Sequence, residues 1–145
     1  MILSFFETTD VLPYVTSTSL LVDGQIIEMT LDEQQTLQEQ VASLFEGSKT
    51  MPAFGVIFDE MYKEEITSGT YISLRFPQLV QVNGLPFDEI VFKVESDWTG
   101  VNLYRGINGV FNGRCIYIEF DKNMNEIYNF IHNLESVKQL ENNAN

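Results

Sequence analysis

Apolar and polar side chains alternate along much of the chain. Apolar residues occupy every second position from Ile72 to Phe76 and again from Ile90 to Val94. A period of two is typical of strands that turn one face towards a core. Turn-forming sequences separate such segments, at 67–69, 83–84, 97–100 and 108–113. The pattern from residue 55 onward therefore predicts an antiparallel meander covered on one side.

The segment before residue 30 predicts a β-hairpin. Asp23-Gly24 separates the apolar-rich segments 19–22 and 25–29. This dipeptide accepts the positive φ angles of a tight two-residue turn, so we expect the flanking segments to pair.

A helix is predicted directly after this hairpin. Thr30 and Glu33 have the spacing of a reciprocal N-terminal cap, so the helix should begin at Leu31. Gly47 is a natural residue to end it. The Gln-rich side of 34–40 is expected to face solvent. The opposite side forms an apolar face, made by Leu37, Val41, Leu44 and Phe45.

The end of the chain predicts one more strand and one more helix. Residues 114–120 have strand character, and Asp121 is placed to cap a helix after them. The apolar positions of this helix recur every three or four residues, at Met124, Ile127, Ile131, Leu134 and Val137. The fold class is therefore α+β: an antiparallel sheet of about six strands with two helices packed on one face. We expect a single domain over 1–140 and a frayed polar tail over 141–145.

The charge of the chain restricts its partners. Its 145 residues include 21 acidic and eight basic side chains, and the net charge is −13. Such a field disfavours nucleic acid and anionic membrane surfaces, which are themselves negative, and favours a basic protein partner. An acidic excess that only increases solubility, as in many bacterial cytosolic proteins, is the alternative.

Cysteine content and hydropathy predict a cytoplasmic location. The one cysteine, Cys115, has no partner for an internal disulfide, and residues 1–6 carry no positive region or cleavage site. The apolar stretches are far shorter than the ~20 residues that a membrane-spanning helix needs.

The sequence offers little catalytic chemistry. His132 is the only histidine, so a pair with Cys115 is the one nucleophilic arrangement to consider. A single cysteine in a strand is more often a small buried apolar side chain. We therefore expect no enzymatic activity, no cofactor and no bound metal.

Four carboxylates gather in one short stretch: Asp59, Glu60, Glu64 and Glu65. Their spacing fits no calcium loop. A solvated turn between strands is the main interpretation, and a contact surface for a basic protein is the functional one. A divalent cation site is a minor alternative.

A glycine-rich segment lies between two arginines. Gly106, Gly109 and Gly113 have the spacing of neither a dinucleotide-binding nor a Walker-type loop, and no lysine follows them. A hairpin loop is the better interpretation. Anion binding between Arg105 and Arg114 is the alternative.

Four aromatic residues are the best candidates for ligand or partner contact: Tyr71, Trp98, Tyr104 and Tyr117. Alternation places Tyr71 and Tyr117 opposite the Ile and Leu positions of their own strands, which predicts that they lie outside the main core. Amphipathic rings on such a face line a pocket or anchor an interface. Ordinary core packing is the alternative.

The order of elements also carries a family resemblance. A strand precedes the helix Leu31–Glu46, then come 51–59, two further strands, and 113–120 running into a helix. Over most of 10–135 this order resembles the two half-repeats of the GyrI-like effector-binding domains. The resemblance implies a cleft between two similar halves that binds a small amphipathic molecule or inhibits a protein, without catalysis. The order is also similar to that of the helix-grip proteins.

Together these features predict a non-enzymatic acidic protein that binds a basic partner, as an immunity protein, a toxin chaperone or an inhibitor. The alternative is a small-molecule-binding domain of the GyrI-like type. A preformed apolar cavity lined by Trp98 and several tyrosines, rather than an exposed patch, would favour this alternative. Pairing of the uncovered sheet face with a second copy would make a homodimer.

Overall fold

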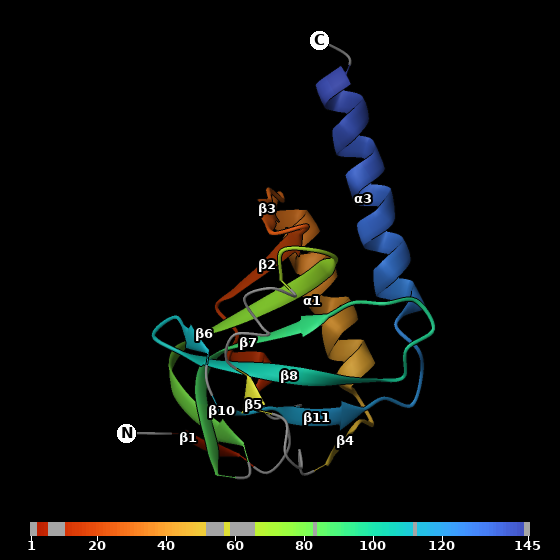
Figure 1. Cartoon of the computed structure of the whole chain (residues 1–145). Helices are drawn as coiled ribbons and strands as arrows, with labels where there is room; N and C mark the ends of the chain where they lie inside the picture. The colour runs from red at the N-terminus through yellow and green to blue at the C-terminus, as the bar shows by residue number, and fades with distance from the viewer. Residues whose placement is uncertain are drawn as a thin grey trace.

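An antiparallel sheet and two helices make up most of the chain (Figure 1). The computed structural model describes residues 3–5, 11–51, 57–58, 66–82, 84–111 and 113–143. Within these ranges, seven strands follow one another in the order β3-β2-β6-β7-β8-β11-β4, and all neighbours in this order are antiparallel. The predicted α+β class with an antiparallel sheet is confirmed.

The strands of this order have the following bounds: β2 Ser17–Val22, β3 Gln25–Ile27, β4 Lys49–Met51, β6 Thr70–Val82, β7 Leu85–Lys93, β8 Gly100–Ile107 and β11 Ile116–Glu119. Two short strands join the same sheet beside it, β1 Leu3–Phe5 parallel to β6, and β9 Val110–Phe111 antiparallel to β8. A further pair is formed by β5 Ile57–Phe58 and β10 Gly113–Arg114. The remaining elements are a short 3-10 helix η2 Leu12–Tyr14 and the helices α1 Leu31–Phe45 and α3 Asn125–Asn143.

The predicted hairpin is present. Strands β2 and β3 pair from Leu20–Ile27 to Val22–Gln25 across a two-residue turn. Asp23 has a φ of 50° and Gly24 a φ of 82°. Two successive positive φ angles give the turn a twist that matches the twist of the strands, so this dipeptide fixes the register.

Helix α1 begins and ends as its sequence predicts. The Thr30 side chain accepts a hydrogen bond from the Glu33 backbone N–H at 3.1 Å, and Glu33 accepts one from the Thr30 N–H at 2.8 Å. These two bonds satisfy donors that the first helical turn leaves open. The helix ends at Phe45, two residues before Gly47. Its buried residues are the four predicted ones, Leu37, Val41, Leu44 and Phe45.

Helix α3 begins later than predicted. It starts at Asn125, so Asp121 does not cap it. The carboxylate of Asp121 instead lies against Gly47, where an added Cβ would collide with it. The predicted apolar stripe is buried as far as its side chains are described, at Met124 just before α3 and at Ile127, Ile131 and Leu134 within it. The helix continues to Asn143 and projects beyond the sheet (Figure 1).

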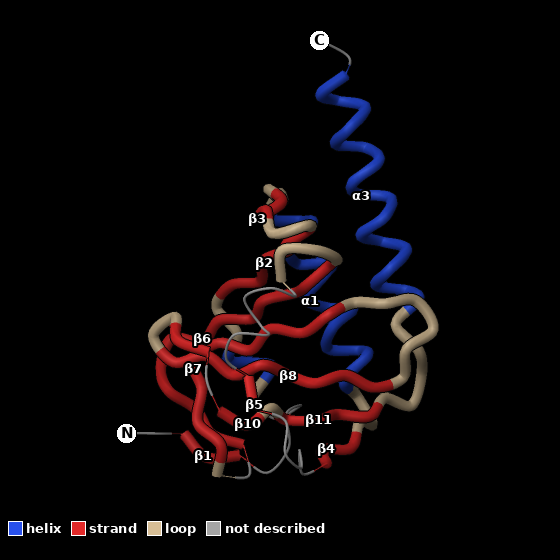
Figure 2. Tube along the Cα trace, viewed as in Figure 1, coloured by secondary structure: helices blue, strands red, loops and turns tan. Residues whose placement is uncertain are grey.

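Alternate strand residues divide between two clusters. The main core combines the buried residues of α1 and α3 with strand residues such as Ile72, Leu74, Ile90 and Phe92. The Phe45 ring of α1 packs against Phe92 and Phe120, with ring centroids 5.6 and 5.5 Å apart. A second-face cluster contains Tyr71, Val91, Tyr104 and Cys115. Because neighbouring strand residues point to opposite faces, the strand residues of this cluster lie on the sheet face opposite the main core. Figure 2 shows the course of these strands and of the two helices.

Candidate functional site

Strands β7 and β8 separate part-way along their length. Their pairing comprises Glu89–Gly106, Ile90–Arg105 and Val91–Tyr104. Continuing this register would place Lys93 opposite Asn102, but these two described residues do not pair. From Gly100 to Leu103, β8 pairs with β11 on its other side. A wedge therefore opens between the end of β7 and the start of β8.

An aromatic pocket of about 630 Å³ lies at this wedge. Its size is within the roughly 300–1,000 Å³ of typical ligand sites. Tyr71 and Tyr104 are buried, with ring centroids 6.4 Å apart, Tyr117 is half-buried, and Trp98 is 43% exposed. The aromatic pocket is lined by Ser68, Tyr71, Lys93, Asp97, Trp98, Thr99, Gly100, Val101, Asn102, Tyr104 and Tyr117.

The structure thus brings together the four aromatic residues that the sequence singled out. They come from β6, β8, β11 and the loop before β8. The prediction that Tyr71 and Tyr117 lie outside the main core is confirmed, because neither belongs to that cluster. The four predicted carboxylates, Asp59, Glu60, Glu64 and Glu65, lie outside the described residues.

The loop that carries Trp98 is fixed to the start of α3. The Asp97 N–H donates to Asn125 Oδ1 at 2.6 Å, and Asn125 Nδ2 donates to Asp97 Oδ1 at 2.9 Å. Asp97 holds a φ of 66°, a conformation that Asp and Asn tolerate better than most residues. Two backbone bonds add to this, from Met124 N–H to the Trp98 carbonyl at 3.0 Å and from Phe120 N–H to the Thr99 carbonyl at 2.7 Å. One wall of the pocket is therefore held in place without a ligand.

A second wall depends on a glycine. A Cβ added at Gly100 would collide with the Tyr117 hydroxyl and lie 2.9 Å from Tyr117 Cζ. The Tyr117 side chain therefore passes so close to the β8 backbone at position 100 that only glycine fits there. Gly100 thereby sets the position of Tyr117 in the pocket.

The lining of the pocket carries one cation, Lys93, and one anion, Asp97. Lys93 Nζ forms an ion pair with Glu95 at 3.1 Å, and the Asp97 carboxylate accepts a hydrogen bond from the Asn125 side-chain amide. Asn102 and the hydroxyls of Ser68 and Thr99 are the remaining polar side chains in the lining. Aromatic faces with a few hydrogen-bonding groups suit a small amphipathic molecule.

Comparison with known proteins supports the fold and leaves function open. No protein-family model matches the chain, and no curated protein sequence matches it. The crystal structure of YycH from Bacillus subtilis is similar, with a TM-score of 0.50 and 13% identity. The match covers 93% of this chain and 40% of the YycH chain, so this chain spans well under half of YycH. At this identity the likeness is one of fold alone.

Lys93, Asp97 and Asn102 were not singled out from the sequence. Asn102 is two residues from Tyr104, so alternation alone places both on one face. Lys93 joins the pocket because it pairs directly with Tyr71 across β6 and β7, and that register is not visible in a single sequence. Asp97 depends on its contact with Asn125, 28 residues away.

The two residues considered for nucleophilic chemistry are not part of the pocket lining. Cys115 is buried in the second-face cluster. His132 is exposed on α3, where its ring stacks on Tyr128 with centroids 6.1 Å apart. Within the part of the chain that the structure describes, no group of three His, Cys, Asp or Glu side chains is placed to hold a metal. None of the described helices is long and apolar enough to span a membrane.

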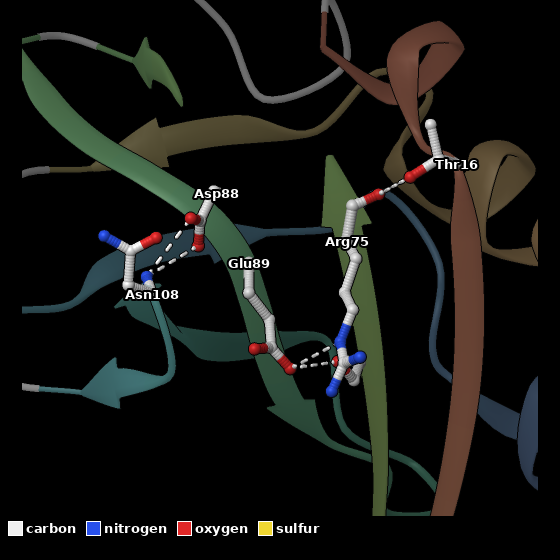
Figure 3. A network of polar contacts seen from close by, with 6 residues as sticks. Thr16, Arg75, Asp88, Glu89 and Asn108 are labelled. Atoms are coloured by element: carbon white, nitrogen blue, oxygen red, sulfur yellow. Dashed lines mark hydrogen bonds and ion pairs between the residues drawn. The ribbon is translucent and has the colours of Figure 1, made fainter. Parts of the chain in front are cut away.

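The glycine-rich loop forms the hairpin between β8 and β9, as predicted. The Asn108 N–H at its tip donates to the Asp88 carboxylate, at 3.1 Å to Oδ2 (Figure 3). Arg105 donates instead to the Pro86 carbonyl at 2.7 Å. Burial lowers the pKa of Arg105 from its ordinary value, and nearby Cys115 opposes this shift. The Asn108 N–H and Arg105 are thus both bonded within the protein, which weighs against an anion site here.

A polar group on the second face lies away from the pocket. Arg75 Nε and Glu89 Oε2 are 3.5 Å apart across β6 and β7, and the two side chains point towards each other in Figure 3. The Ser73 hydroxyl donates to the same Glu89 oxygen at 2.5 Å. Arg75 is 60% exposed, so this ion pair adds little to stability. It neutralises one of the few cations of the chain.

Proposed function

We propose that this chain is a non-catalytic binding domain that holds a small amphipathic molecule in the aromatic pocket. The observation that carries the proposal is the convergence of Tyr71, Trp98, Tyr104 and Tyr117 around one pocket. The sign of small-molecule binding expected from the sequence is a preformed apolar cavity lined by Trp98 and several tyrosines. The pocket has these aromatic residues, and its lining also includes polar side chains. The GyrI-like resemblance, which implies a cleft between two similar halves, remains a prediction.

The pocket contains its own reporter. Trp98 is the only tryptophan of the chain, and it forms part of the pocket wall. Binding of a molecule against its ring changes its solvent exposure and therefore its emission. A metabolite library can be screened by this emission together with thermal unfolding. At a concentration 100-fold above Kd, a ligand stabilises the fold by about 2.7 kcal/mol, or roughly 5–10 °C in Tm for a domain of this size.

Two substitutions test whether hits occupy this site. Trp98→Ala and Asn102→Ala should each weaken binding, because both side chains line the pocket. Val110→Ala and Asn129→Ala are matched controls, because both residues are exposed and lie outside the lining. Hits whose affinity is unchanged in both pocket variants, or a library without any hit, would refute the proposal.

The inhibitor, immunity or chaperone role remains a second proposal, supported by charge. The net charge is −13, and three described cations are already paired: Arg75 with Glu89, Lys93 with Glu95 and Lys122 with Glu126. Uncompensated carboxylates therefore dominate the surface and favour encounter with a basic protein. Association that does not weaken as salt rises would contradict this role.

A further inference from the structure

A second concave surface, the α1 groove, lies between α1 and the segment around η2. Its volume is about 800 Å³. Leu12 and Val15 form one wall, the side of α1 that begins at Leu31 forms the other, and Leu74 of β6 lies at the base. The groove follows α1 over its 15 residues, or about 22 Å.

Part of this apolar surface is open to solvent. Leu31 is 82% exposed, and Leu12 and Val15 are half-buried. Gln34 and Gln38 of α1 also line the groove and are half-buried. The sequence alone predicts that this side of the helix faces solvent. A partner that covers Leu31 would remove apolar area from water that the chain alone leaves exposed.

The charge of the groove is negative without compensation from α1. Residues 28–47 contain five acidic side chains and no basic one. Glu39 and Glu46 line the groove, and the last turn of α1 carries no cation against the negative end of its dipole. Lys122 reaches the wall by donating to Ser43 at 2.8 Å. That lysine lies 4.0 Å from Glu126, so its charge is shared.

We propose that the α1 groove binds a cationic amphipathic helix of a partner protein. This inference goes beyond the aromatic pocket and rests on the second proposed function, binding of a basic protein. The apolar side of the partner helix would cover Leu31, Leu12 and Val15, and its Lys or Arg residues would lie near Glu39 and Glu46. A helix fits better than a strand, because side chains of α1 form one wall and offer no backbone groups for strand pairing.

A designed peptide tests the proposal directly. The probe is a labelled helical peptide with Leu at positions a and d of two heptads and Lys elsewhere. A scrambled peptide of the same composition controls for charge alone. Wild-type protein should bind the patterned peptide at least tenfold more tightly than the scrambled one in fluorescence anisotropy. Rising salt should weaken this binding.

Variants then locate the binding site. Leu31→Ser should weaken binding of the patterned peptide about tenfold, and Glu39→Gln and Glu46→Gln about threefold each. Glu119→Gln is the matched control, since it is exposed on β11, lies outside the groove lining and removes the same charge. Leu31 is exposed, so its replacement should leave the fold intact, and circular dichroism checks this.

Each other outcome overturns the inference in a distinguishable way. Equal binding of both peptides, or no effect of Leu31→Ser, would exclude the groove as the binding site without contradicting the binding of a basic protein. Absence of binding by either peptide would contradict both. The molar mass in solution could also rise with protein concentration and return to that of the monomer in Leu31→Ser. This result would assign the groove to a second copy of this chain.

Discussion

The contact between Asp97 and Asn125 provides the sharpest test of the pocket's construction. Asn125→Ala removes an acceptor from the Asp97 N–H at 2.6 Å and a donor to the Asp97 carboxylate at 2.9 Å. Lost bonds of these kinds destabilise by about 1 and about 1.5 kcal/mol, and their exposure to solvent lowers the combined effect somewhat. We therefore expect the free energy of unfolding to fall by about 2 kcal/mol, or roughly 4–8 °C in Tm.

Urea denaturation followed by circular dichroism measures this change, and Trp98 emission reports the loop in the folded state. The emission of Asn125→Ala should move towards that of solvent-exposed tryptophan, because the loop before β8 loses its fixed wall. Asn129→Ala is the matched control, being exposed one helical turn further on. If the two variants differ by less than about 0.5 kcal/mol and Trp98 emission is unchanged, the contact does not hold the pocket.

Three further substitutions probe separate parts of the fold, each by denaturant unfolding. Gly100→Ala should destabilise by about 1–3 kcal/mol, because the new Cβ displaces Tyr117, and it should also reduce ligand affinity. Thr30→Ala should cost about 1 kcal/mol by leaving the Glu33 N–H without its cap, and Thr30→Ser should restore it. Phe45→Ala should cost about 3–5 kcal/mol, because its ring is fully buried. A loss below about 0.5 kcal/mol in any of the three would contradict the corresponding contact.

Local signals explain why parts of the fold could be predicted from the sequence. The β2–β3 turn and the start of α1 depend on neighbouring residues: Asp23 with Gly24, and Thr30 with Glu33. The apolar face of α1 follows from helical periodicity. The start of α3 has a different origin. Its first turn is positioned by the loop around Asp97, and no sequence pattern near Asp121 encodes a contact of that range.

The candidate site, too, could be predicted only in the part that depends on local sequence. Strand alternation was enough to place Tyr71 and Tyr117 outside the main core. The pocket itself exists because β7 and β8 stop pairing at Val91–Tyr104. Register between strands is set by the whole sheet, so the contribution of Lys93 could not be derived from its neighbours in sequence.

The two proposed surfaces can be separated by their response to salt. The lining of the aromatic pocket carries one cation, Lys93, and one anion, Asp97, so binding there depends mainly on aromatic contact and hydrogen bonds. In the α1 groove, Glu39 has no cation beside it in the lining, and binding there includes a long-range attraction that salt screens over about 8–10 Å. The two surfaces lie on opposite faces of β6, which contributes Tyr71 to one and Leu74 to the other. Ligand affinity that is insensitive to salt therefore indicates the pocket, and affinity that falls with salt indicates the groove.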